Sequence, residues 1–140
     1  MKTRTKVMAI TLVFAVPTFL LGKIIWPPVA VPPAQLLPFY IFLVALESLL
    51  FGLGVSFLIF GLPVVRRVLP EYRRLAFWSY LAIAWQMVSW WPHDNLHAHI
   101  GMDFFRLLGI EYGFHLTLMI SAVILAYAFF KSWSQSRTAD

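Results

Sequence analysis

The residues of this chain that are best suited to chemistry lie in one short stretch, WWPHDNLHAHIGMDFF, at positions 90–105. It holds three of the four histidines of the 140-residue chain, His93, His97 and His99, together with two aspartates. The fourth histidine, His115, follows in the next apolar run. Imidazole and carboxylate groups are ligands that copper, zinc and iron accept in proteins. The clustering therefore indicates a transition-metal site built from nitrogen and oxygen ligands.

Two spacings within the stretch could bring imidazoles together on one ion. His93 and His97 share a face if the segment is helical, whereas His97 and His99 can chelate from an extended segment. Cysteine is absent, so sulfur would have to come from a methionine such as Met87, Met102 or Met119. The candidate metal ligands are His93, His97, His99, Asp103, Glu111, His115 and, as an inner ligand or a neighbouring hydrogen-bond acceptor, Glu47.

The composition places these residues in a membrane protein, because 61% of the chain is hydrophobic and only 12% is charged. Four apolar runs approach or exceed the ~20 residues that a helix needs to cross a bilayer. We therefore expect an all-α integral membrane protein whose single domain, residues 1–140, is a bundle of four transmembrane helices. The expected helices span about 7–26, 36–65, 75–91 and 107–130, and an outer histidine-rich loop spans 92–106.

The basic start, MKTRTK, followed by an apolar run, could also belong to a cleaved signal peptide. The run continues through Lys23 into IIWPP, and no small-x-small cleavage site closes it. We therefore expect the first run to be retained as a membrane helix.

The formal net charge of +5 is explained by topology rather than by nucleic-acid binding. With the N-terminus in the cytoplasm, Lys23 and Arg106 fall outside and the other nine basic residues fall inside. These nine are Lys2, Arg4, Lys6, Arg66, Arg67, Arg73, Arg74, Lys131 and Arg137. Cytoplasmic loops retain positive charge during insertion. The asymmetry predicts a multi-pass protein of a bacterial-type inner (plasma) membrane, with both termini cytoplasmic and the histidine-rich segment outside.

Several polar residues fall at membrane depth, where such groups usually face a protein interior and find partners. They are Glu47, Gln86, Glu111 and His115, and Glu47 alone could instead be a protonated acid bonded to a backbone carbonyl or to Gln86. Small residues at helical spacing accompany three of them, which favours close helix contact on those faces. The stripes are Glu47 with Gly54 and Gly61, Gln86 with Ser79, Ala82 and Ser89, and His115 with Ala122 and Ala126.

These features favour a small membrane protein with a transition-metal site for copper, zinc or iron, serving redox chemistry or metal handling. No catalytic residue is assigned, so the sequence does not decide whether the protein is an enzyme. The alternative is a non-catalytic accessory subunit of a larger membrane complex, because 140 residues leave little mass outside the bilayer. Other membrane subunits or further copies of the chain are the expected partners. Proton or ion movement through Glu47, Glu111 and His115 ranks third, since few polar groups continue that path inward.

Overall fold

The computed structural model describes residues 3–101 and 103–138, and all regular secondary structure among them is helical. The elements are α1 (Thr3–Ile25), the short 3-10 helix η1 (Ala34–Leu36), α2 (Leu37–Val68), α3 (Arg73–Val88), α4 (Trp90–Ile100) and α5 (Phe104–Thr138). Three segments, Thr3–Ile25, Ala34–Val68 and Phe104–Gln135, are long and apolar enough to cross a membrane. The prediction of an all-α chain with membrane-type helices is thus confirmed. Lys2, Met102 and the side chain of Arg137 lie outside the described residues.

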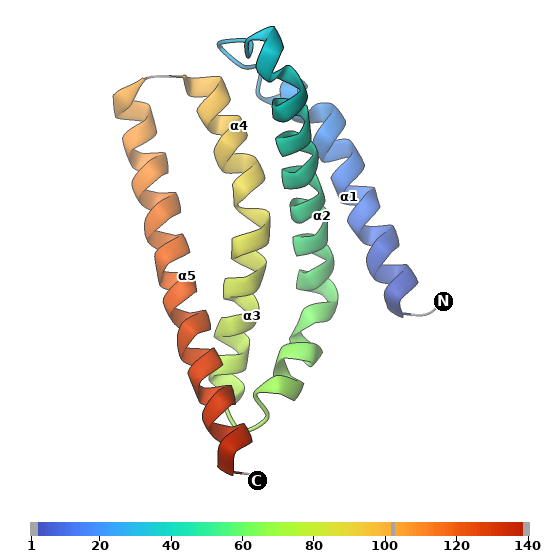
Figure 1. Ribbon diagram of the computed structural model, residues 1–140, viewed down its shortest axis with the longest axis vertical. Helices are drawn as coiled ribbons and strands as arrows, with labels where there is room; N and C mark the ends of the chain where they lie inside the picture. Colours follow the sequence, from blue (N-terminus) through green and yellow to red (C-terminus); the bar gives the residue numbers. More distant parts are fainter. Residues whose placement is uncertain (1–2, 102, 139–140) are drawn as a thin grey trace.

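The helices stand in a row, in which α1 packs on α2, α2 on α3, and α3 on α5 (Figure 1). Helix α4 continues upward from α3 and lies between α2 and α5. The edges of the row are α1 and α5, and the N- and C-terminal ends lie toward the end opposite the α4–α5 turn (Figure 1). The chain therefore forms an open row of helices, in which α1 and α5 do not close a ring.

Glycines allow α2 to approach the helices on both of its sides. A Cβ atom on Gly52 would lie 2.3 Å from the carbonyl oxygen of Thr11 in α1, and one on Gly54 would lie 2.5 Å from Cγ1 of Val88 in α3. Close approach also permits a polar contact, because the Ser56 hydroxyl lies 2.9 Å from that of Thr11 and donates to the carbonyl of Val7. Small residues thus set the spacing on both sides of α2.

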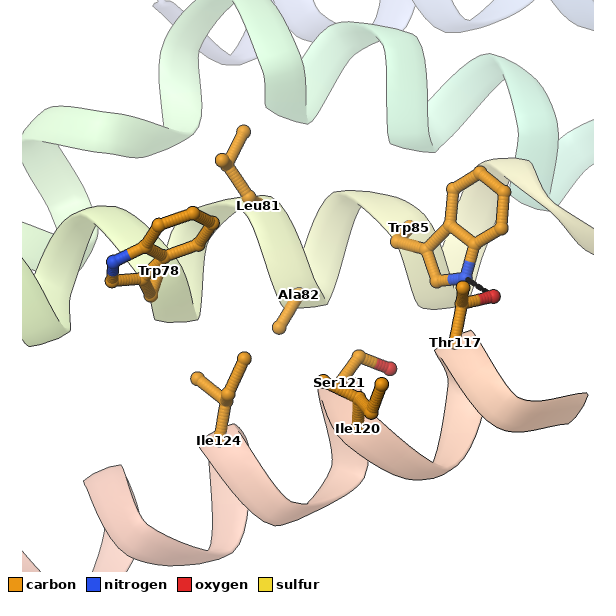
Figure 2. Close-up of a pocket in the computed structure, with 8 residues that line it drawn as sticks. All are labelled: Trp78, Leu81, Ala82, Trp85, Thr117, Ile120, Ser121 and Ile124. Atoms are coloured by element: carbon orange, nitrogen blue, oxygen red, sulfur yellow. Dashed lines mark hydrogen bonds between the residues drawn. The ribbon is translucent and has the colours of Figure 1, made fainter. Parts of the chain in front are cut away.

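Helices α3 and α5 are joined by polar side chains. Nε2 of Gln86 donates to the Leu118 carbonyl at 3.1 Å and to the Ser121 hydroxyl at 2.6 Å, so Gln86 bonds to α5 and not to Glu47. Nε1 of Trp85 donates to the Thr117 hydroxyl at 3.1 Å, on the edge of a cavity of about 250 Å³ between the two helices (Figure 2). In apolar surroundings such bonds help to fix the helix contact.

The face that α5 turns toward its neighbours differs from the predicted one. Phe114, Ser121 and Ala128, spaced at seven residues, are buried. Ala122 and Ala126, which the sequence placed on the inward face with His115, are exposed. Each residue turns a helix by about 100°, so an error of one position moves a stripe by a quarter of the circumference. The spacing identified a stripe but could not fix the rotation of the helix.

The predicted loop over 92–106 is wrong, because α4 occupies Trp90–Ile100 and only residues 101–103 lie between α4 and α5. Pro92 explains the break between α3 and α4. Proline has no N–H to donate to the carbonyl of Val88 and its ring crowds that group, but it fits the first turn of a new helix. At the other end, α4 stops at Ile100 and is followed by Gly101, whose φ of 69° favours glycine.

The close approach of α2 to α1 yields a first prediction. Gly52→Ala places a methyl group against the backbone of α1, and such overpacking typically costs about 1–3 kcal/mol. We expect a corresponding decrease in the free energy of unfolding, measured by chemical denaturation in detergent. Gly109→Ala is the matched control, because a Cβ there meets nothing within 4 Å. Equal stability of the two variants would contradict the close α1–α2 contact.

Candidate metal centre

Four of the predicted ligands come together where α4 faces the first third of α5. His93 and His97 lie one turn apart on α4, and Glu111 and His115 lie one turn apart on α5. Residues four apart share a helix face, so each helix contributes a pair to the same space. The helical His93–His97 pairing is therefore the one that the structure adopts.

The Glu111 carboxylate is the centre of this cluster. Its Oε1 lies 3.3 Å from Nε2 of His93 and also contacts Nε2 of His97, while its Oε2 lies 3.0 Å from Nδ1 of His115. His93, Glu111 and His115 each offer a ligand atom, and these atoms all lie within 4.8 Å of one another. The donors of a tetrahedral zinc site, bound at ~2.1 Å, lie about 3.4 Å apart. This group could therefore hold a metal ion after small side-chain movements.

His93 is the most buried member of the cluster, with 9% of its surface exposed. Its ring stacks on Phe114 at a centroid distance of 3.7 Å and an interplanar angle of 15°. Its Nδ1 lies 2.8 Å from Oδ1 of Asp94, whereas its Nε2 forms no hydrogen bond among the described residues. A buried nitrogen without a hydrogen bond is unfavourable. Because this nitrogen lies 3.3 Å from Oε1 of Glu111, it is within reach of a cation held by that carboxylate.

Asp94 is the functional candidate that the sequence did not identify. Histidines that bind metals usually give their second ring N–H to a carboxylate or a carbonyl, which fixes the tautomer and the ring orientation. Asp94 holds His93 in this way, with Nε2 at 3.3 Å from Oε1 of Glu111. Its only sequence signal is adjacency to a histidine, which is too common to single out one acid.

Glu47 lies on the far side of Asp94 from the cluster. Its carboxyl group lies close to that of Asp94 and interacts with it. The two residues line a cavity of about 110 Å³ with Tyr40, Leu43, Val44 and Asn95. The structure thus brings Glu47 to the residue that orients His93, in the position of a neighbouring acceptor rather than among the ligands.

The other two predicted ligands have different partners. Nδ1 of His99 lies 2.8 Å from the carbonyl oxygen of Pro27, beside the backbone bond from Val29 to Ala98. Two residues along a helix turn the side chain by about 200°, so His99 faces away from His97. Asp103 accepts a bond from the backbone of Arg106 at the start of α5 and also pairs with its side chain. Both residues shape the ends of α4 and α5.

The cluster has an open side on α5. His115 is 54% exposed and Glu111 33% exposed, and both line a cavity of about 360 Å³ together with Tyr112, Leu116 and Met119. Met119, one turn after His115 on α5, is therefore the candidate thioether next to the cluster. Met87 lies on α3, where its Cβ packs against Gly54 of α2. An ion bound to Glu111 and His115 would have free coordination positions toward this cavity.

Comparison of the chain with protein-family models, with curated proteins and with solved structures yields no match. The assignment of the cluster therefore depends on its geometry and chemistry.

The contact between Glu47 and Asp94 yields the second prediction. Glu47→Gln keeps a group that can bond to the Asp94 carboxylate, whereas Glu47→Leu leaves that carboxylate without this partner. Asp94 is 42% exposed and keeps its contact with His93, so the loss of Glu47 as a partner should cost only about 0.5–1.5 kcal/mol. Unfolding in detergent should therefore show Glu47→Leu to be less stable than Glu47→Gln by about that amount. Equal tolerance of both changes would mean that the contact with Asp94 contributes nothing.

Proposed function

We propose that this chain is an integral membrane protein that binds a transition metal between α4 and α5. The observation that carries the proposal is the Glu111 carboxylate within reach of three imidazoles, one of them the buried His93, whose Nε2 forms no hydrogen bond within residues 3–101 and 103–138. We assign His93, Glu111 and His115 as ligands, and His97 as a fourth ligand or a donor to Glu111. Metal handling or electron transfer are the functions that such a site would serve.

A four-span arrangement fits the row of helices if α3 and α4 cross the bilayer together. Helix α3 has 16 residues, or about 24 Å at ~1.5 Å per residue, which is short for a hydrocarbon core of ~30 Å. The combined segment from Arg73 to Ile100 reaches about 40 Å, with a bend at Ser89. In this arrangement the metal cluster lies near one surface of the membrane.

Copper is the first metal that we propose, with zinc and iron as the other candidates. The protein donors are imidazoles and one carboxylate, which all three metals accept. Met119 favours copper, because its thioether lines the same cavity as Glu111 and His115, and thioethers select cuprous ions. When bound, copper would supply one-electron redox chemistry.

Metal analysis of protein purified in mild detergent without chelator gives the third prediction. We expect one equivalent of a transition metal per chain. His115→Ala and Glu111→Gln each remove a ligand at a partly exposed position, so each should lower metal affinity roughly tenfold or more without unfolding the protein. Occupancy should also fall on acidification, since a protonated imidazole cannot bind a metal.

His99→Ala is the matched control for these variants. It removes an imidazole from the same segment, but one that bonds to Pro27 and not to the cluster. We expect its metal content to equal that of the unmodified protein. Absence of stoichiometric metal, or full retention of metal by the His115 and Glu111 variants, would refute the proposed site.

The fourth prediction concerns orientation, for which we propose cytoplasmic termini in an inner membrane. The motivation is the excess of Lys and Arg near the termini and the α2–α3 turn.

Val31 lies between α1 and α2 and is 82% exposed. Because the chain has no cysteine, Val31→Cys creates a single thiol, which an impermeant reagent should label in intact cells. A reporter fused after Asp140 should be active in the cytoplasm. Labelling of Val31→Cys only after cell lysis would indicate the opposite orientation.

A role as an accessory subunit is the second candidate. The observation that favours it is the open side of the cluster, where exposed Tyr112, Leu116 and Met119 surround His115 on the edge helix of the row. A partner subunit could cover this face. Co-purification of a larger complex with metal-free protein would support this role over the first.

A further inference from the structure

A second site lies at the opposite end of the molecule, at the turn between α2 and α3. A cavity of about 370 Å³ is lined there by Arg66, Leu69, Pro70 and Arg73. Arg66 belongs to the last turn of α2, and Arg73 is the first residue of α3. Two guanidinium groups from different helices therefore border the same space.

The turn that carries these arginines is held by backbone hydrogen bonds. The amide of Leu69 donates to the Val65 carbonyl at 3.1 Å, and the amide of Tyr72 donates to the Leu69 carbonyl at 3.2 Å. Leu69 is only 3% exposed and packs in a core with Val65 and Ala76. These contacts fix the turn, and with it the positions of the residues that line the cavity.

The positive charge around the cavity has no counterpart among the described residues. None of the ion pairs found in residues 3–101 and 103–138 includes Arg66 or Arg73. The acid of the turn, Glu71, accepts a hydrogen bond from Gln135. The first turn of α3 contains no acid and two arginines, although the N-terminal end of a helix disfavours cations. An anion in the cavity would relieve both effects.

The position of the α2–α3 turn at the end of a membrane-type segment indicates which anion is available to the cavity. The membrane-type segment Ala34–Val68 ends there, and Ile59, which lies two turns before Arg66 on the same face of α2, is an exposed apolar residue. We propose that Arg66 and Arg73 bind the phosphate of an anionic phospholipid, whose acyl chains lie along the apolar end of α2. Guanidinium groups match phosphate oxygens through paired hydrogen bonds. Free inorganic phosphate shares this chemistry but lacks the apolar contact.

The fifth prediction compares two pairs of arginines that carry the same charge. Arg66→Gln with Arg73→Gln should weaken binding of dioleoylphosphatidylglycerol to the detergent-purified protein by roughly tenfold, because the charge-assisted bonds to phosphate are lost. Arg67→Gln with Arg74→Gln removes the same charge from the same turn but from residues that do not line the cavity. This control pair should bind the lipid as the unmodified protein does. Native mass spectrometry of lipid titrations measures both.

Each other outcome overturns the proposal. Equal losses in the two pairs would mean that only the general positive charge attracts lipid. Equal affinity for inorganic phosphate, or its displacement of the lipid at matched concentration, would identify a soluble anion as the ligand. If the variant with Arg66→Gln and Arg73→Gln fails to insert into the membrane, a variant with Arg66→Lys and Arg73→Lys replaces it. Lysine keeps the charge but cannot form the paired hydrogen bonds of a guanidinium group. Lipid binding by that lysine pair should still be weaker, and unchanged binding would refute the site.

Discussion

An ionisable carboxyl group in an apolar helix must find partners, and the way in which Glu111 meets this constraint organises the upper half of the molecule. Its carboxylate lies against the imidazoles of His93, His97 and His115. Two of those imidazoles belong to α4, which Pro92 separates from α3. Because α4 is not a continuous extension of α3, its direction is not set by α3. The contact with Glu111 therefore helps to fix the position of α4.

The other faces of α4 are held with equal specificity, which explains how a helix of 11 residues keeps one position. Trp91 packs against the rings of Trp26 and Phe51, at centroid distances of 5.0 and 5.2 Å. His99 bonds to the carbonyl of Pro27, between α1 and α2, and the Asp94 carboxyl group contacts Glu47 of α2. Isolated helices of this length are marginal in water, so these tertiary contacts supply its stability. The orientation of His93 is consequently coupled to α2 through Asp94.

The sequence predicted the class of this structure better than its details, for physical reasons. Apolar runs identify membrane-type helices because length and hydropathy are local properties. The polar stretch at 92–106 was misread as a loop, because histidine and asparagine are weak helix formers and α4 derives its stability from tertiary contacts. The metal candidates were a set of seven, and the structure gathers four of them. His99 could not be separated from His97 without knowing that the segment is helical, and Asp94 carried no signal beyond adjacency.

The cluster separates two sides of unlike polarity, and this constrains how an ion would reach it. Toward α2 lie the carboxyl groups of Asp94 and Glu47, which suit a hydrated cation. Toward the free face of α5 lie Leu116 and Met119, where water is scarce in a bilayer. A divalent ion would keep more of its hydration on the first side. A cuprous ion, weakly hydrated and suited to thioether ligands, is compatible with the second. In the copper site that we propose, Met119 on the apolar side would supply a thioether, which a zinc site does not need.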